Sequence, residues 1–166
     1  RPWNGVLIWN YHRIGDAASS LFDPHLFSAT ADDFDRQVGF LKQNFDVIGL
    51  TDLEQALGQP RGQFVMLTFD DGYRDNFESA FPILKSHGVP ATFFIATGFI
   101  DHPRVPVWDE LAWMSQTTAL PVLAANDWLP SPVSFAGQDG TQAFRKLLTV
   151  YRTAGNQGGE EIPRGL

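Results

Sequence analysis

The stretch that decides the fold is residues 64–72, Phe64-Val65-Met66-Leu67-Thr68-Phe69-Asp70-Asp71-Gly72. A short apolar run rich in β-forming residues is typical of a strand buried on both faces of a parallel sheet. The run ends in two adjacent carboxylates and a glycine, and the ligands and catalytic groups of α/β proteins collect where such strands end. The stretch therefore predicts a parallel α/β fold with a candidate site at its two acids.

The two acids of this stretch have two interpretations. Adjacent strand residues point to opposite sides, so Asp70 and Asp71 need not share a role. One carboxylate could bind a cation while the other takes a proton from water. Asp-Gly is also a common turn dipeptide, and a second Asp can simply cap the helix that follows. On spacing alone, the turn and cap are favoured over the metal-assisted site.

Composition limits the function classes that remain open. The 166 residues are 43% hydrophobic and 19% charged, which is enough to bury one sizeable core. A formal net charge of −7, with no basic cluster longer than Arg145-Lys146, argues against nucleic acid and anionic membranes as general partners. The chain has no cysteine, which excludes disulfides, thiolate metal ligands and cysteine nucleophiles.

The sequence leaves the location of the protein open. No run approaches the ~20 apolar residues of a membrane span, so no span is expected. The first residues, 1–5, contain no apolar signal segment. Both the cell envelope and the cytoplasm therefore remain compatible with the sequence.

Hydrophobic spacing predicts β/α repeats in the first two thirds of the chain. Strands are expected over residues 6–11, 45–50, 64–69 and 91–97. A long loop over residues 15–28 precedes a helix that Thr30 opens, and a short helix to Leu57 begins with the capping-box pattern of Thr51 to Glu54. Each strand is thus followed by a helix, as parallel pairing requires.

The helix that follows the acid pair shows an interrupted pattern. It begins at Tyr73 and ends at His87, before a glycine and a proline. Pro82 lies inside the helix and implies a kink or break. One apolar stripe is predicted to face the core: Phe77, Ala80, Phe81 and Leu84.

The last third of the chain changes character. Helices are expected around Trp108 to Ser115 and around Phe144 to Tyr151, with no further strong parallel strand. These features predict one partial domain over residues 1–153, with a core over 6–100 and a helical insertion over 104–153. Residues 154–166 have little to bury and are expected to form a mobile tail.

At this point the chain resembles a known family. Residues 67–72, Leu-Thr-Phe-Asp-Asp-Gly, followed by a helix and then by residues 88–95, Gly-Val-Pro-Ala-Thr-Phe-Phe-Ile, are similar to the polysaccharide deacetylases, the NodB-homology domain of carbohydrate esterase family four. Residues 11–14, Tyr-His-Arg-Ile, and the region of Trp108 resemble members associated with bacterial exopolysaccharides. The resemblance spans about residues 6–113. It implies the first half of a deformed (β/α) barrel.

The resemblance also implies roles for individual residues. Asp70 matches the catalytic general base, and Asp71 matches a ligand of a divalent metal, with Zn²⁺ expected first and Co²⁺ or Ni²⁺ as alternatives. The reaction would remove acetyl groups from an amino-sugar polysaccharide or oligosaccharide. We place the backbone N–H that stabilises the oxyanion at Tyr73, because this residue follows the turn and opens a helix. His12 ends the first strand and is expected either to line the site or to serve as a hydrogen-bonded structural residue.

The sequence departs from the family at the metal site. The four histidines form no His-Ser/Thr-x-x-His pair, and neither the arginine-proline motif nor the leucine-histidine motif is present. A catalytic Zn²⁺ normally takes three protein ligands, so these residues supply half an active site and the metal could be absent. We therefore expect a deacetylase truncated before its histidine ligands. The alternatives are a non-catalytic saccharide-binding domain or pseudoenzyme, and an amidase that acts on small C–N bonds.

Half a barrel would leave sheet edges without a partner strand. Unpaired edges can form hydrogen bonds with a strand of another chain, so self-association through these edges is predicted. The alternatives are a segment that covers the edges, or marginal stability.

Overall fold

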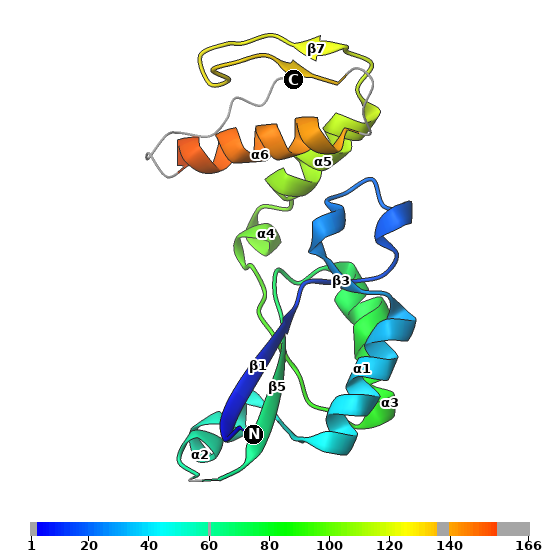
Figure 1. Ribbon diagram of the computed structural model, residues 1–166, viewed down its shortest axis with the longest axis vertical. Helices are drawn as coiled ribbons and strands as arrows, with labels where there is room; N and C mark the ends of the chain where they lie inside the picture. The colour runs from blue at the N-terminus through cyan, green and yellow to red at the C-terminus, as the bar shows by residue number, and fades with distance from the viewer. Residues whose placement is uncertain (1–2, 60, 136–139, 156–166) are drawn as a thin grey trace. The chain divides into compact units, whose positions relative to one another are not determined.

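A parallel sheet centred on β5 (Gln63–Phe69) organises the N-terminal half of the chain (Figure 1). On one edge, β1 (Gly5–Tyr11) pairs with β5 along its whole length. The other edge of β5 is divided, because β4 (Asp46–Ile48) pairs with its first half and β6 (Thr92–Phe93) with its last residues. All these pairings are parallel, which confirms the predicted α/β class, although β6 is shorter than the predicted strand.

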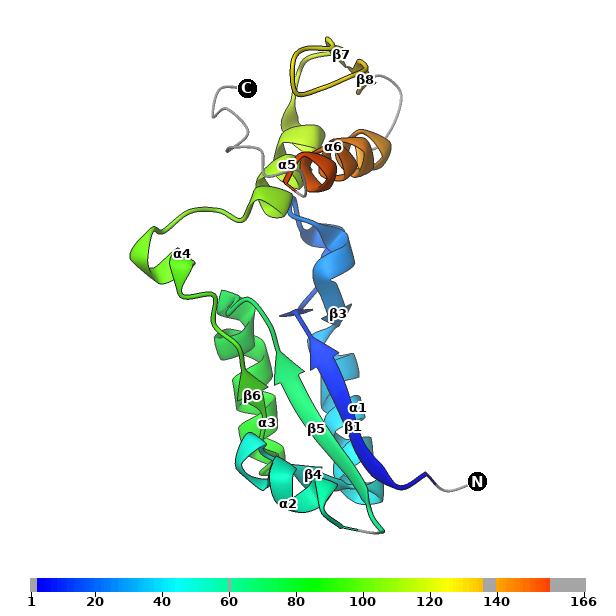
Figure 2. The same cartoon turned by 90° about the vertical axis from the view of Figure 1, so that its left-hand side faces the viewer.

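Two helices, α1 (Ala31–Asn44) and α3 (Phe81–His87), lie on one face of this sheet (Figures 1 and 2). Thr30 caps α1 as predicted, since its hydroxyl accepts a hydrogen bond from the Asp33 N–H at 3.1 Å. Hydrogen bonds from Thr30 and Arg36 also lower the pKa of the Asp33 carboxyl. The core beneath the helices consists of Tyr11, Ile14, Phe34, Val38, Leu41, Val65, Leu67, Phe69, Ala80, Leu84 and Val89.

The apolar stripe predicted for the helix after the acid pair is right for Ala80 and Leu84, which are buried, and wrong for the two phenylalanines. Phe77 is 74% exposed and Phe81 45% exposed. The cause is a π-helical turn, η4 (Asn76–Ala80), which precedes α3. A π turn contains an extra residue and rotates the side chains that follow. The predicted break at Pro82 is confirmed: this proline lies in the first turn of α3, where a backbone N–H has no helical partner.

Short elements fill the connections. The long loop contains two 3₁₀ helices, η1 (Ala17–Ser19) and η2 (Pro24–Leu26), and its flanks form a parallel pair, β2 (Arg13–Ile14) with β3 (Phe27–Ala29). A 3₁₀ turn, η3 (Leu50–Asp52), leads into α2 (Leu53–Leu57).

The capping box predicted from Thr51 lies two residues too late in the chain. The Asp52 carboxylate accepts a hydrogen bond from the Gly49 N–H at 3.2 Å, so the turn begins at Gly49 with one half of a capping box. The short helix that ends at Leu57 is confirmed.

The computed structural model describes residues 3–59, 61–135 and 140–155, and the chain divides into two units: residues 1–20 with 24–103, and residues 21–23 with 104–166. α4 (Gly98–Asp101) is the last helix of the first unit.

The second unit contains both predicted helices, α5 (Val107–Thr117) and α6 (Thr141–Gly155). A short antiparallel hairpin that the sequence did not indicate joins them, β7 (Val122–Leu123) with β8 (Val133–Ser134). The core of this unit consists of Leu111, Ala112, Leu129, Val133, Ala143, Phe144 and Leu147.

The first two residues of the predicted tail, 154 and 155, belong to the last turn of α6. The rest of the predicted tail lies outside the described residues. The assignment of residues 1–153 to one partial domain stays a prediction. Within the described ranges, no helix combines the length and the apolar character needed to cross a membrane.

Candidate active site

The pairing of β1 with β5 brings three polar side chains to one end of the sheet. Asn10 pairs with Thr68, and the next pair, Tyr11 with Phe69, points to the opposite face. The Asp70 N–H donates to the Tyr11 carbonyl at 3.0 Å and so continues the ladder past β5. By alternation, Asp70 projects from the same face as Asn10 and Thr68.

The helix-covered face at this level is closed by aromatic packing. The rings of Tyr11 and Phe69 stack at 5.2 Å, and Phe34 meets both edge-on. The Tyr11 hydroxyl donates to Gln37 Oε1 at 2.8 Å. Burial raises the pKa of Tyr11 to about 12. This face is therefore core, and the reactive groups gather on the other one.

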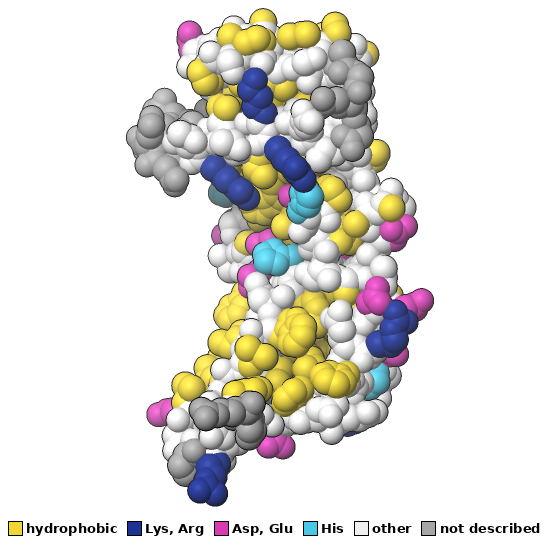
Figure 3. Space-filling view, viewed as in Figure 1, with side chains coloured by type: hydrophobic (Ala, Val, Ile, Leu, Met, Phe, Trp, Pro, Cys, Tyr) yellow, Lys and Arg dark blue, Asp and Glu magenta, His cyan; other side chains and the backbone are white. Residues whose placement is uncertain are grey.

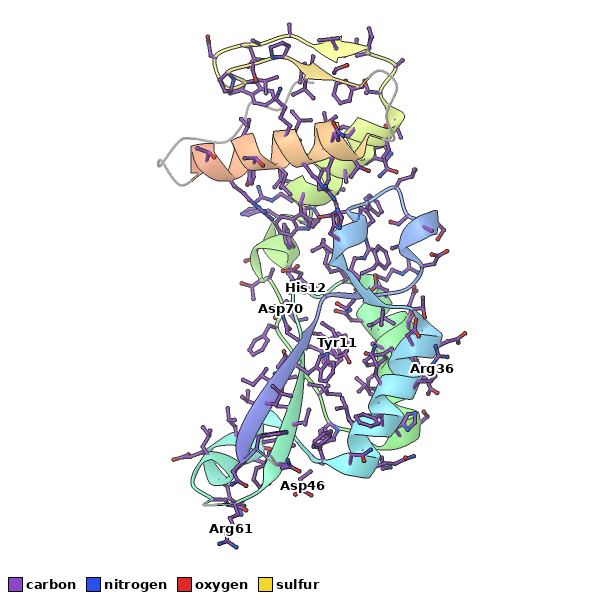
Figure 4. The ribbon with its side chains drawn as sticks, viewed as in Figure 1. Tyr11, His12, Arg36, Asp46, Arg61 and Asp70 are labelled. Carbon is purple, nitrogen blue, oxygen red and sulfur yellow. The ribbon has the colours of Figure 1, made fainter. Side chains whose placement is uncertain are left out.

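The Asp70 carboxylate is held through one of its two oxygens. Asn10 Nδ2 donates to Asp70 Oδ2 at 2.9 Å, and His12 Nε2 lies 3.9 Å from the same oxygen (Figure 4). The side chains of Asp70 and His12 remain 37% and 35% exposed. The structure thus brings His12 to the carboxylate predicted as the base, while the catalytic roles of both residues stay predictions.

Asp71 turns the chain out of the sheet. It is the one non-glycine residue in the described ranges with a positive φ, 68°, and Gly72 follows at 71°. A left-handed conformation costs an L-residue about 1–2 kcal/mol. The Asp71 carboxylate makes no hydrogen bond to any other described residue, so it does not cap the helix that follows. The turn is confirmed, the cap is not, and the role as metal ligand stays a prediction.

Tyr73 follows this turn outside every strand ladder. Its ring packs against the Arg13 guanidinium at 4.7 Å, and Phe27 packs against the same guanidinium at 4.5 Å. Arg13 Nε donates to Asp75 Oδ2 at 2.9 Å, which ties β2 to the chain after the acid pair. Tyr73 is therefore well anchored, and its oxyanion role stays a prediction.

Three site residues were not singled out by the sequence. Asn10 contacts Asp70 directly, whereas Ser28 and Asn76 hold the backbone of His12: the His12 N–H donates to Ser28 Oγ at 3.0 Å, and Asn76 Nδ2 donates to the His12 carbonyl at 2.7 Å. A polar residue that interrupts an apolar strand can indicate a site residue. Asn10, between Trp9 and Tyr11, showed this pattern.

The described residues do not fit a complete metal site. No three His, Cys, Asp or Glu side chains among them lie close enough to share an ion. Asp71 projects from its turn without two partner ligands, and His12 faces Asp70. A divalent ion would therefore need ligands other than these.

Comparison with known proteins identifies the segment around the acid pair. Residues 58–124 match the family model for polysaccharide deacetylase. This segment is similar to part of a polysaccharide deacetylase domain. The matched segment contains β5, Asp70, Asp71 and Tyr73. The resemblance drawn from the sequence motifs is thus confirmed.

Relatives of known name agree with this assignment. Poly-beta-1,6-N-acetyl-D-glucosamine N-deacetylase of Staphylococcus aureus (strain MSSA476) is 34% identical over 110 residues, which are 58% of this chain and 38% of the relative. YxkH of Bacillus subtilis (strain 168) is 38% identical over 58 residues, 35% of this chain and 21% of the relative.

A solved structure supports the deacetylase fold. The structure of IcaB from Ammonifex degensii superimposes with a TM-score of 0.51 and 28% identity, over 58% of this chain and 40% of that chain. The chain therefore spans 21% to 40% of the length of these relatives.

Proposed function

We propose that this deacetylase segment belongs to an enzyme that hydrolyses N-acetyl groups of an amino-sugar polysaccharide, with Asp70 as the general base. One observation carries the proposal: inside the matched segment, a partly exposed carboxylate is held through a single oxygen at the carboxyl end of a parallel strand. The name of the Staphylococcus aureus relative supports the substrate class.

The proposed chemistry uses water as the nucleophile. Asp70 takes a proton from water while the water oxygen bonds to the acetyl carbonyl carbon. The carbon–nitrogen bond then breaks, the leaving nitrogen takes up the proton that Asp70 accepted, and acetate and a free amino sugar are released. The Tyr73 N–H is proposed to stabilise the negative charge on the carbonyl oxygen.

Metal dependence is proposed only for an enzyme that contains this segment together with the further metal ligands that Asp71 would need. The family resemblance implies Asp71 as one ligand, with Zn²⁺, Co²⁺ or Ni²⁺ as the ion. Because the described residues supply no group of three ligands, no catalytic step is assigned to an ion here.

Acetate release tests the proposal. The chain is incubated with β-1,6-linked N-acetylglucosamine oligomers, with and without added Zn²⁺, Co²⁺ or Ni²⁺, and both acetate and free amine are measured. Asp70→Asn is expected to reduce release by at least about 100-fold, because an amide cannot accept the proton from water. The matched control is Asp46→Asn, which changes a carboxylate at the opposite end of the sheet (Figure 4).

Three outcomes would contradict the proposal. Equal release by the wild type and Asp70→Asn would remove Asp70 from the reaction. Oligosaccharide binding without release under any ion condition would favour the non-catalytic saccharide-binding alternative. A small acetamide hydrolysed faster than the oligomers would favour the amidase.

A further inference from the structure

We propose that Thr68 and Asn10 form a positioning pair that holds the Asp70 carboxylate in one orientation. The inference deepens the proposed function and rests on it for the identity of Asp70 as the base. Neither residue is assigned a role by the family motifs. Both are brought to the site by the register of β1 on β5.

The pair is a short chain of hydrogen bonds. The Thr68 hydroxyl donates to Asn10 Oδ1 at 2.8 Å, and Asn10 Nδ2 donates to Asp70 Oδ2 at 2.9 Å. Asn10 and Thr68 project from the same face of two paired strands, and the Asp70 N–H extends the ladder by one bond to Tyr11, so the backbone pairing fixes the spacing of all three residues. Catalytic groups held by strands are placed more precisely than groups held by loops.

The carboxylate selects the orientation of the Asn10 amide. A hydroxyl can donate or accept, so Thr68 alone would tolerate either orientation of the amide. With the amide reversed, Asn10 Oδ1 would face Asp70 Oδ2, and two acceptors would repel each other. The orientation with Nδ2 toward Asp70 is therefore the one that satisfies both neighbours.

Because Thr68 is buried, its hydroxyl depends on the hydrogen bond to Asn10. Thr68 is 4% exposed, inside an otherwise apolar strand, and Asn10 is the hydrogen-bond partner of its hydroxyl in the described structure. A buried hydroxyl that lost this partner would remain unsatisfied, which is unfavourable. Thr68 thus anchors an Asn10 side chain whose own residue is exposed.

The consequence for Asp70 is a difference between its two oxygens. Oδ2 accepts from Asn10 and lies near His12, whereas no described residue hydrogen-bonds to Oδ1. Fixing Oδ2 aims Oδ1 in one direction. Oδ1 is then the atom that takes the proton from water in the proposed reaction.

Three variants test the pair. Thr68→Val removes the hydroxyl at nearly constant shape, Thr68→Ser keeps the hydroxyl, and Asn10→Leu removes the amide at an exposed position. The matched control is Ile8→Val, on the same strand and face as Asn10 and exposed. Thermal unfolding of each variant verifies that it is folded.

The first measurement does not depend on activity. Three-bond NMR couplings to the Asp70 Cγ report the side-chain torsion angle χ1. We expect a single staggered rotamer in the wild type, Thr68→Ser and Ile8→Val, and averaging between rotamers in Thr68→Val and Asn10→Leu. Couplings that stay unchanged in Thr68→Val and Asn10→Leu would overturn the proposal.

The second measurement is the split between kcat and KM for the acetylated oligomers. Loss of the pair should lower kcat roughly tenfold and leave KM unchanged, because the pair orients the base without touching substrate. Thr68→Ser should restore kcat. Equal kcat for Thr68→Val and Thr68→Ser would overturn the proposal. A wild-type chain that releases no acetate would count against the proposed function. The NMR couplings would still show whether Thr68 and Asn10 hold the Asp70 side chain in one rotamer.

Discussion

At the residue scale, the site depends on pairs that are distant in the sequence. Asp70 and Asp71 were found because they follow a buried strand, and the structure places Asp70 where strand ends predict it. Asn10 was not found, because its link to Thr68 spans 58 positions and exists only once β1 is paired with β5. Periodicity reports which face a residue occupies, but the partner across a parallel ladder depends on register.

Gly72 provides a test of the turn at this scale. Its φ is +71°, and an added Cβ would lie 2.9 Å from Ile95 Cδ1. Gly72→Ala is therefore expected to lower the free energy of unfolding by about 1–2 kcal/mol, measured by urea denaturation. Gly98→Ala is the control, because its Cβ would meet no atom within 4 Å. Equal stability of the two variants would mean that the turn is not strained.

At the element scale, the regular strands and helices followed from hydrophobic spacing, and the irregular ones did not. Buried residues at 3.6-residue spacing and a threonine cap predicted α1 correctly. The stripe predicted across η4 and α3 was wrong at Phe77 and Phe81 because a π turn changes the period within the helix. The hydrogen bond from Gly49 to Asp52 was missed because glycine has no side chain to mark a cap. Sequence patterns assume one period per element, and η4 violates that assumption.

Tyr11 of β1, which bonds to Gln37 of α1, predicts that the stability of the fold depends on pH. The pKa of Tyr11 is raised to about 12 by burial, above its model-peptide value of 10.0. The protonated form is thus favoured in the folded chain. Its contribution to stability is full below about pH 10 and is lost as the pH rises toward about 12.

Tyr11→Phe isolates this effect. The variant should lose about 1 kcal/mol at neutral pH with the hydrogen bond to Gln37, but should show a shallower fall in stability between about pH 10 and 12. Chemical denaturation across this range measures both quantities. Identical alkaline slopes for the two proteins would refute the assignment to Tyr11.

At the scale of the whole molecule, the described sheet presents apolar side chains to solvent. Leu7, Ile8 and Trp9 of β1 are exposed, and hydrophobic side chains gather over the sheet of the first unit (Figure 3). In the described residues, β1 pairs through one edge only, with β5. A free edge beside exposed apolar residues favours pairing with another chain.

Self-association of the chain through β1 is therefore predicted. Ile8→Lys should shift the mass measured by light scattering toward the monomer, because a charge on an edge strand opposes pairing. Phe40→Lys is the control, since Phe40 is exposed on α1 rather than on the sheet. A monomeric wild type at every concentration, or an equal shift in both variants, would contradict an interface at β1.

The left-handed backbone at Asp71 also limits how the site can change during evolution. Asparagine and glycine accept a positive φ readily, whereas β-branched residues do not. A single substitution to asparagine would remove the negative charge at almost no conformational cost. Catalytically silent descendants of this domain would therefore be expected to carry asparagine or glycine at this position, with the fold around it preserved.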